Sequence, residues 1–128
     1  MLLFAGHDPG AKNHLRPLYN HALEQGYTAR FIDLAASVDL REIVDTLIPS
    51  SGDPSTVLVC GASDNRSEWP LIRAGKSAGI STAMVVELQV KPKIDGGSQS
   101  DFPDRFLVTN ARCVDELTTL GARRETIV

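Results

Sequence analysis

Cysteine is scarce in this chain of 128 residues, and the two that are present do not lie in any metal-binding or disulfide pattern. Cys60 falls inside an apolar run and Cys113 in a predicted helix, and no Cys-x-x-Cys pair or suitably spaced histidine accompanies them. We therefore expect two buried or half-buried free thiols and no metal site.

Long apolar runs and clusters of basic residues are missing as well. No stretch approaches the roughly 20 apolar residues of a membrane-spanning helix, and the apolar run at residues 1–5 lacks the length and basic flank of a signal peptide. The 13 Lys and Arg residues are scattered, and 16 Asp and Glu residues outnumber them to give a net charge of −3. These absences argue against a membrane span and against a nucleic-acid partner, and they predict a soluble, cytoplasmic protein.

Apolar runs alternate with amphipathic stretches along the whole chain, as is typical of βαβ units. The strands that we predict occupy residues 2–6, 27–34, 56–60, 80–87 and 105–109, and residues 126–128 look like the first half of a sixth. The first predicted helix begins between residues 13 and 16, which places Pro17 in its first turn. The others cover residues 38–48, 68–78 with Ser67 as N-cap, and 111–120, and residues 88–104 are predicted to be a long loop.

This pattern predicts one α/β domain, a three-layer α/β/α sandwich around a doubly wound, Rossmann-like parallel sheet of five or six strands. A chain of this length can bury its own core. We expect the strand order 3-2-1-4-5, in which the loops after the first and fourth strands face each other and the loop 61–67 lies farther along the same edge. The interrupted last strand favours the N-terminal half of a two-domain protein.

The turn after the first predicted strand holds most of the candidate site. Gly6 and Gly10 lie four residues apart with no third glycine, so the dinucleotide-binding fingerprint fails, and the stretch from Gly6 to Asn13 is one residue short of a Walker A loop. We therefore expect no nucleotide cofactor. What remains is a turn that a ligand can approach closely, followed by a helix N-terminus that favours anions. The predicted ligand contacts are Gly6, Pro9, Gly10, Ala11 and Asn13, although Pro9 and Gly10 could simply shape the turn.

Two segments resemble glycosyltransferase-B enzymes. Residues 13–32 carry a His-x-x-Pro at His14 to Pro17, a small-apolar helix face, and a Gly26-Tyr27 step into the next strand. Residues 103–110, with Glu116-Leu117 and Leu120-Gly121-Ala122, are similar to the segment that closes the N-terminal half of those enzymes. The resemblance implies an acceptor-side domain that does not transfer sugar alone, because the domain that mainly holds the nucleotide-sugar donor is not in this sequence.

If the resemblance holds, an acceptor hydroxyl attacks the anomeric carbon of a nucleotide sugar with the help of a general base. His7, Asp8 and His14 are the candidates, and His14 matches the His-x-x-Pro position. The turn reads His-Asp-Pro-Gly-Ala where many relatives have a run of glycines, so the choice among the three stays open. Asp8 could instead cap the turn, and His14 could instead donate to a backbone carbonyl.

Residues that follow two other strands complete the predicted site. Glu87, at the end of the fourth strand, could accept a hydrogen bond from a sugar hydroxyl or be a solvated strand end. Ser63, Asp64 and Asn65 either line the cleft or shape their own turn. The implied partners are a sugar or glycan acceptor and a nucleotide-sugar donor, with a homodimer possible. The alternative function is a stand-alone Rossmann-like module that binds a small molecule, a phosphate or a partner without catalysis.

Overall fold

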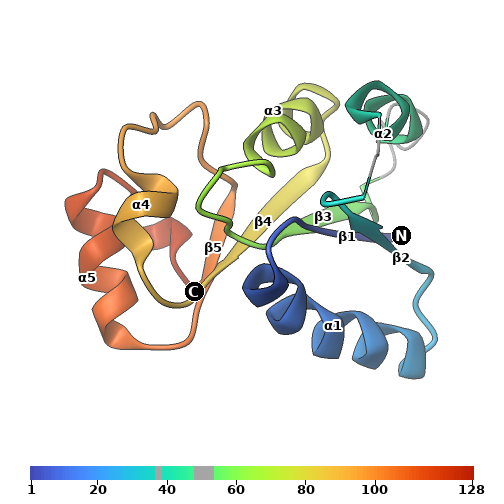
Figure 1. Cartoon of the computed structure of the whole chain (residues 1–128), viewed down its shortest axis with the longest axis horizontal. Coiled ribbons are helices and arrows are strands. Elements are labelled where there is room, and N and C mark those ends of the chain that lie inside the picture. Colours follow the sequence, from blue (N-terminus) through green and yellow to red (C-terminus); the bar gives the residue numbers. More distant parts are fainter. Residues whose placement is uncertain (37–38, 48–53) are drawn as a thin grey trace.

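The computed structural model describes residues 1–36, 39–47 and 54–128. Within these residues one sheet is formed by five parallel strands in the order β2-β1-β3-β4-β5 (Figure 1). The strands are β1 (Leu2–Gly6), β2 (Ala29–Asp33), β3 (Val57–Cys60), β4 (Ser81–Val86) and β5 (Arg105–Val108).

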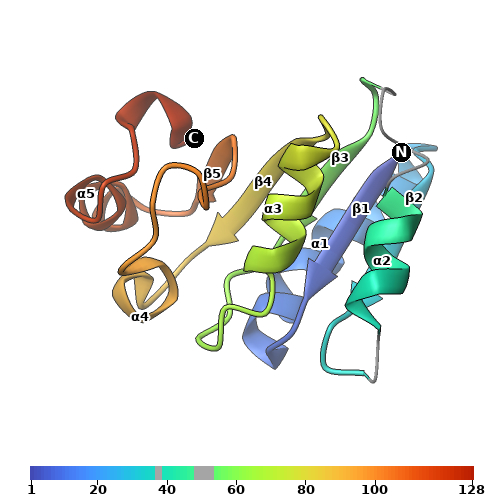
Figure 2. The same cartoon turned by 90° about the horizontal axis from the view of Figure 1, so that it is seen from above.

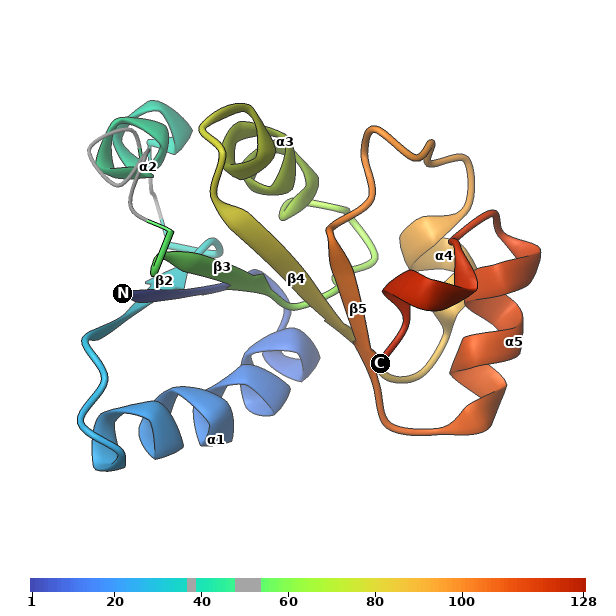
Figure 3. The same ribbon diagram turned by 180° about the vertical axis from the view of Figure 1, so that it is seen from behind.

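Helices cover both faces of the sheet, which confirms the predicted three-layer α/β/α architecture. Helix α1 (Pro9–Glu24) lies on one face, and α2 (Leu40–Leu47) and α3 (Trp69–Ser77) lie on the other (Figure 2). Helices α4 (Val90–Ile94) and α5 (Ala111–Thr119) pack together at the β5 end of the sheet (Figure 3). None of the helices in the described part of the chain is long and apolar enough to cross a membrane.

Successive strand residues point to opposite faces and so build two apolar cores. Leu3 and Leu58 belong to the larger core, which also takes in buried side chains of α3, α4 and α5. Phe4 and Val59, their neighbours in sequence, belong to the smaller core beneath α1, where Leu15 is fully buried. The sheet is therefore covered on both sides at its centre, as a parallel sheet requires.

The strand order differs from the predicted 3-2-1-4-5, because β3 lies at the centre of the sheet between β1 and β4, and β2 takes the edge position that was predicted for the third strand. Strand β3 is an unbroken apolar run with three buried residues, whereas β2 carries Arg30 and Asp33 and has one. Burial on both faces suits the first strand, and an edge position suits the second. As a consequence the chain leaves neighbouring strands β1 and β3 in opposite directions, so the switch point lies between them.

Helix α1 begins at Pro9 and not near residues 13–16, which puts Pro17 in its interior. Proline at the first helical position loses no hydrogen bond, because that N–H has no intrahelical partner anyway. Pro17 has no N–H, so the carbonyl of Asn13, four residues earlier, lacks its helical hydrogen bond. Both residues are exposed, and water can therefore reach that carbonyl.

Three smaller predictions also need correction. Residues 88–104 are not one loop, since they contain α4, which is anchored by buried Val90 and Ile94. Ser67 does not cap α3; its hydroxyl and N–H both donate to the Asn65 side chain, and Glu68 is the N-cap residue. The C-terminal residues form a short 3₁₀ helix (Arg124–Thr126) and then a single parallel bridge from Ile127 to Phe106 in place of a sixth strand. The predicted helix ends at residues 38 and 48 lie outside the described residues.

Candidate functional site

Neighbouring strands β1 and β3 bring the loop at residues 7–8 against the loop at residues 61–67. The Asp8 N–H donates to Ser63 Oγ at 3.1 Å, and the Asp64 N–H donates back to Asp8 Oδ2 at 3.1 Å. Ser63 and Asp64 therefore lie beside the first turn, and not farther along the edge as the predicted strand order implied.

A buried carboxylate, which the sequence analysis did not single out, connects these two loops. Glu68 is fully buried, and its Oε1 accepts hydrogen bonds from the His7 N–H at 2.9 Å and the Ser63 hydroxyl at 2.6 Å. Its other oxygen, Oε2, is buried and has no hydrogen-bond partner in the described part of the chain. Glu68 thus holds the backbone of His7 in place beside β3.

His7 and Asp8 form a pair at the surface of this loop cluster. His7 Nδ1 lies 2.9 Å from Asp8 Oδ1, and the hydrogen bond from His7 holds the pKa of the Asp8 carboxyl below its ordinary value, although partial burial opposes this. The amide nitrogen of Asn65 lies 3.2 and 3.3 Å from the two ring nitrogens of His7. Since the ring nitrogens point in different directions, the amide packs against the ring and restrains it.

The remaining predicted contacts of the first turn lie around the start of α1. Gly6 is buried at the end of β1, and Ala11 is buried against Gly61, where a Cβ atom at position 61 would come within 2.6 Å of the Ala11 Cβ. Pro9, Gly10 and Asn13 are exposed, and nothing lies within 4 Å of where a Gly10 Cβ would be. Gly6 and Ala11 therefore serve packing, and the other three line an open surface.

The His14 side chain contacts the Glu87 carboxylate, and this contact joins α1 to the end of β4. The pair links His14 Nε2 to Glu87 Oε2, and the two side chains are 45% and 32% exposed. Helix α1 reaches β4 because it lies across one face of the sheet, where it contacts β1, β2 and β4 (Figure 1). The two groups that the sequence analysis placed on opposite walls of one crevice are thus in direct contact.

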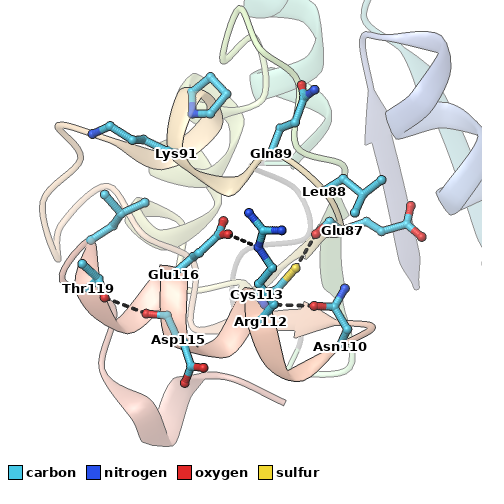
Figure 4. A pocket seen from close by; sticks show the side chains of 12 residues that line it. Glu87, Leu88, Gln89, Lys91, Asn110, Arg112, Cys113, Asp115, Glu116 and Thr119 are labelled. Carbon is cyan, nitrogen blue, oxygen red and sulfur yellow. Dashed lines mark hydrogen bonds and ion pairs between the residues drawn. The ribbon is translucent and has the colours of Figure 1, made fainter.

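A cavity of about 820 Å³ lies next to this pair, between α4 and α5. Glu87 is at one end of it, and Figure 4 shows Arg112 and Glu116 reaching from α5 toward α4. Cys113 lies in its wall, where its thiol donates to the Glu87 carbonyl. The cavity opens at the carboxyl ends of β4 and β5, the edge of an α/β sheet at which ligands bind. Sequence reasoning missed it because its upper wall, α4, was expected to be a loop.

A lysine–aspartate pair stands on the opposite side of α1 from His14. Lys12 Nζ lies 3.0 and 2.9 Å from the two carboxylate oxygens of Asp33, at the end of β2. The hydrogen bond from Lys12 lowers the pKa of Asp33. The parallel register places Gly6 beside Asp33 and so brings the Lys12 and Asp33 side chains together. No short sequence motif predicts this contact.

The two cysteines are free and buried, as predicted. Burial raises the pKa of the Cys60 thiol well above its ordinary value, and the nearby Glu68 carboxyl adds to this. Burial also raises the pKa of Cys113, so neither sulfur is a ready nucleophile. Across residues 1–36, 39–47 and 54–128, no three His, Cys, Asp or Glu side chains gather closely enough to hold a metal ion.

The sheet edge therefore carries two separate histidine–carboxylate pairs. The His7–Asp8 pair belongs to a network that ties two loops together, and its ring is restrained by Asn65. The His14–Glu87 pair borders a cavity and leaves one ring nitrogen, Nδ1, without a protein partner in the described residues. No protein-family model matches the chain, and no curated protein or solved structure matches it either.

Proposed function

We propose that this chain is the acceptor-side domain of a glycosyltransferase-B-type enzyme and that His14 is its general base. The observation that carries the proposal is the contact between His14 and Glu87 at the mouth of the cavity. A carboxylate that holds one nitrogen of an imidazole fixes the ring and leaves the other nitrogen free to accept a proton. The resemblance of residues 13–32 to that family, with His14 at the His-x-x-Pro position, supports the same assignment.

In the proposed reaction, His14 Nδ1 removes the proton from an acceptor hydroxyl while the oxygen attacks the anomeric carbon of a nucleotide-diphosphate sugar. The new bond joins the acceptor oxygen to that carbon, and the bond from the carbon to the diphosphate oxygen breaks. The nucleoside diphosphate leaves with the electron pair. Glu87 stabilises the imidazolium that forms, and the donor is held mainly by a second domain.

His14 is a better base than His7 because of what surrounds each ring. His7 Nδ1 already faces Asp8, and the Asn65 amide packs against both of its nitrogens. The backbone of His7 is also tied to buried Glu68. These contacts suit a residue that shapes the loop. Asp8 accepts two hydrogen bonds within the same cluster, which leaves it a similar role.

Sugar transfer by the protein expressed from the complete reading frame that contains this sequence tests the proposal. A panel of nucleotide sugars is offered with simple alcohols as acceptors, and transfer is followed by mass spectrometry. We expect His14→Gln to lower kcat/KM by about 10²- to 10⁴-fold, the usual contribution of a general base. His21→Gln, in the same helix with a side chain that is 69% exposed, is the matched control and should leave the rate unchanged.

Glu87→Gln should lower kcat less than His14→Gln does, because the amide can still hold the ring but cannot stabilise its charge. The absence of transfer from every donor, or equal activity of the His14 and His21 variants, would contradict the proposal. Binding without transfer is the second candidate function, and the cavity favours it because all of its walls come from this chain. Ligand binding combined with no transfer would support that alternative.

A further inference from the structure

The α4–α5 cavity is large enough to hold a small molecule. Its volume of about 820 Å³ falls in the range of roughly 300–1,000 Å³ of small-molecule sites. Buried Val90 and Ile94 fix α4 to the core, and the Arg66 side chain donates twice to the Pro92 carbonyl, at 3.1 and 3.3 Å. Helix α4, which forms one wall of the cavity, is therefore fixed by core packing on one side and by the Arg66 hydrogen bonds on the other.

Charged groups line this cavity, but nearly all of them already have a side-chain partner. Asp115 is the exception among the described residues, and Figure 4 shows its carboxylate pointing away from α4. Since the Lys91 and Arg112 side chains are 71% and 87% exposed, water screens their charges, and they offer a charged ligand little binding free energy. The three pairs are Glu87 with His14, Lys91 with Asp95, and Arg112 with Glu116.

Apolar groups form most of the surface that remains for a ligand, beside the uncharged polar residues Gln89, Asn110 and Thr119. Leu88 is 66% exposed although it is a large hydrophobic side chain, and Pro92 and Leu120 also line the cavity. The Cys113 thiol offers no hydrogen bond to a ligand, because it already donates to the Glu87 carbonyl. An apolar ring or chain that covers Leu88 would remove this surface from water.

The backbone at the entrance to α4 is unusual as well. Gln89 has φ 54° and ψ 53°, a left-handed conformation that residues other than glycine rarely adopt. Such conformations cluster at binding sites, where the surrounding structure maintains them. Here the conformation separates exposed Leu88 from buried Val90, so that the chain can leave β4 and turn at once into the cavity wall.

From these observations we propose that the cavity binds the apolar body of a neutral alcohol and presents its hydroxyl group to Glu87 and His14. The acceptor class of the enzyme is then an uncharged alcohol with an aromatic or aliphatic body. This inference rests on the proposed function for the fate of the hydroxyl group, but the binding itself does not depend on sugar transfer.

A series of three naphthalene probes with the same ring system tests the charge preference. The probes are 2-naphthylmethanol, 2-naphthoate and 2-naphthylmethylammonium, titrated into ¹⁵N-labelled protein and followed by NMR. We expect the alcohol to shift the amide signals of α4 and α5 and to bind about tenfold more tightly than either charged probe. The absence of shifts at α4 and α5, or equal or tighter binding of a charged probe, would overturn the inference.

Two leucine variants locate the binding surface. Leu88→Ser should weaken binding of 2-naphthylmethanol by about fivefold, because it removes apolar contact area. Leu23→Ser, at a leucine that is 45% exposed near the end of α1, is the matched control and should not change the affinity. Equal effects of the two variants would place the probe elsewhere. We expect nuclear Overhauser contacts between the probe methylene and the His14 ring. Contacts between the distal naphthalene ring and His14 would show that the probe binds in the opposite orientation.

The outcomes separate this inference from the proposed function. If the alcohol binds in the cavity and no sugar is transferred, the ligand class stands and the transferase proposal fails. If transfer depends on His14 and the neutral probe does not bind between α4 and α5, the transferase proposal stands and the ligand class is wrong.

Discussion

Replacement of Glu68 by leucine tests whether this buried carboxylate holds the two loops of the switch point together. The leucine side chain has a similar size but cannot accept the hydrogen bonds from the His7 N–H and the Ser63 hydroxyl. Each buried donor left without a partner costs about 1–3 kcal/mol. Leucine also removes the buried Oε2, an oxygen that has no hydrogen-bond partner in the described part of the chain. The loss of this unpaired group offsets about 1–3 kcal/mol of the cost.

The net loss expected for Glu68→Leu is therefore about 1–3 kcal/mol in the free energy of unfolding. Glu68→Gln keeps one oxygen at the acceptor position and should lose no more than about 1 kcal/mol. Urea denaturation measures both. With a slope of about 1–3 kcal/mol per molar urea, the leucine variant should unfold at a concentration about 1 M lower than the wild type.

An exposed glutamate supplies the control for this pair of variants. Glu24→Leu, at a side chain that is 73% exposed, should change the free energy of unfolding by less than about 0.5 kcal/mol. The amide proton of His7 should exchange faster in Glu68→Leu than in Glu68→Gln. If the leucine and glutamine variants were equally stable and protected the His7 amide equally, the two hydrogen bonds would not be what connects the loops.

Two further predictions concern α1 and the turn before it. The carboxyl pKa of Asp8, followed by ¹³C NMR, should lie below the ordinary value of about 3.9 and rise toward it in His7→Gln, since His7 is the main cause of the shift. Because the folded pKa is the lower one, this stabilisation is complete above about pH 4 and is lost as the pH falls through the folded value; an unchanged pKa in His7→Gln would contradict the assignment. Pro17→Ala should raise the free energy of unfolding by about 1–3 kcal/mol, measured by thermal unfolding, because it restores an interior helix hydrogen bond on an exposed face. A lower Tm would show that Pro17 stabilises α1 in another way.

The alternation of apolar runs and amphipathic stretches was enough to predict the parallel sheet with helices on both faces. It was not enough to order the strands, because a local pattern does not say which runs become neighbours. The information was nevertheless present in the composition of two segments. Arg30 and Asp33 interrupt β2, whereas Val57 to Cys60 contains no polar residue, so their edge and central positions follow from which strand tolerates burial on both faces.

Several residues of the candidate site could be predicted from the sequence, but the contacts between them could not. Turn chemistry pointed to His7, Asp8 and His14, and the strand ends pointed to Ser63 and Glu87, all of which lie at one edge of the sheet. Which side chains would pair could not be predicted, since the His14–Glu87 contact depends on where α1 crosses the sheet. Glu68 looked like an ordinary polar residue at a helix start, and its burial follows from the pairing of β1 with β3.

The close approach of Gly61 to Ala11 has a consequence for how related sequences can diverge. The ideal Cβ position of residue 61 lies 2.6 Å from the Ala11 Cβ and 3.1 Å from the Ala11 Cα, so the obstruction includes the backbone of α1. Position 61 is therefore restricted to glycine, and position 11 to alanine or glycine, for as long as α1 keeps its place beside β3. In a family alignment the two positions would vary together: a larger residue at either one should occur only in sequences that have changed the length of the turn between residues 6 and 11.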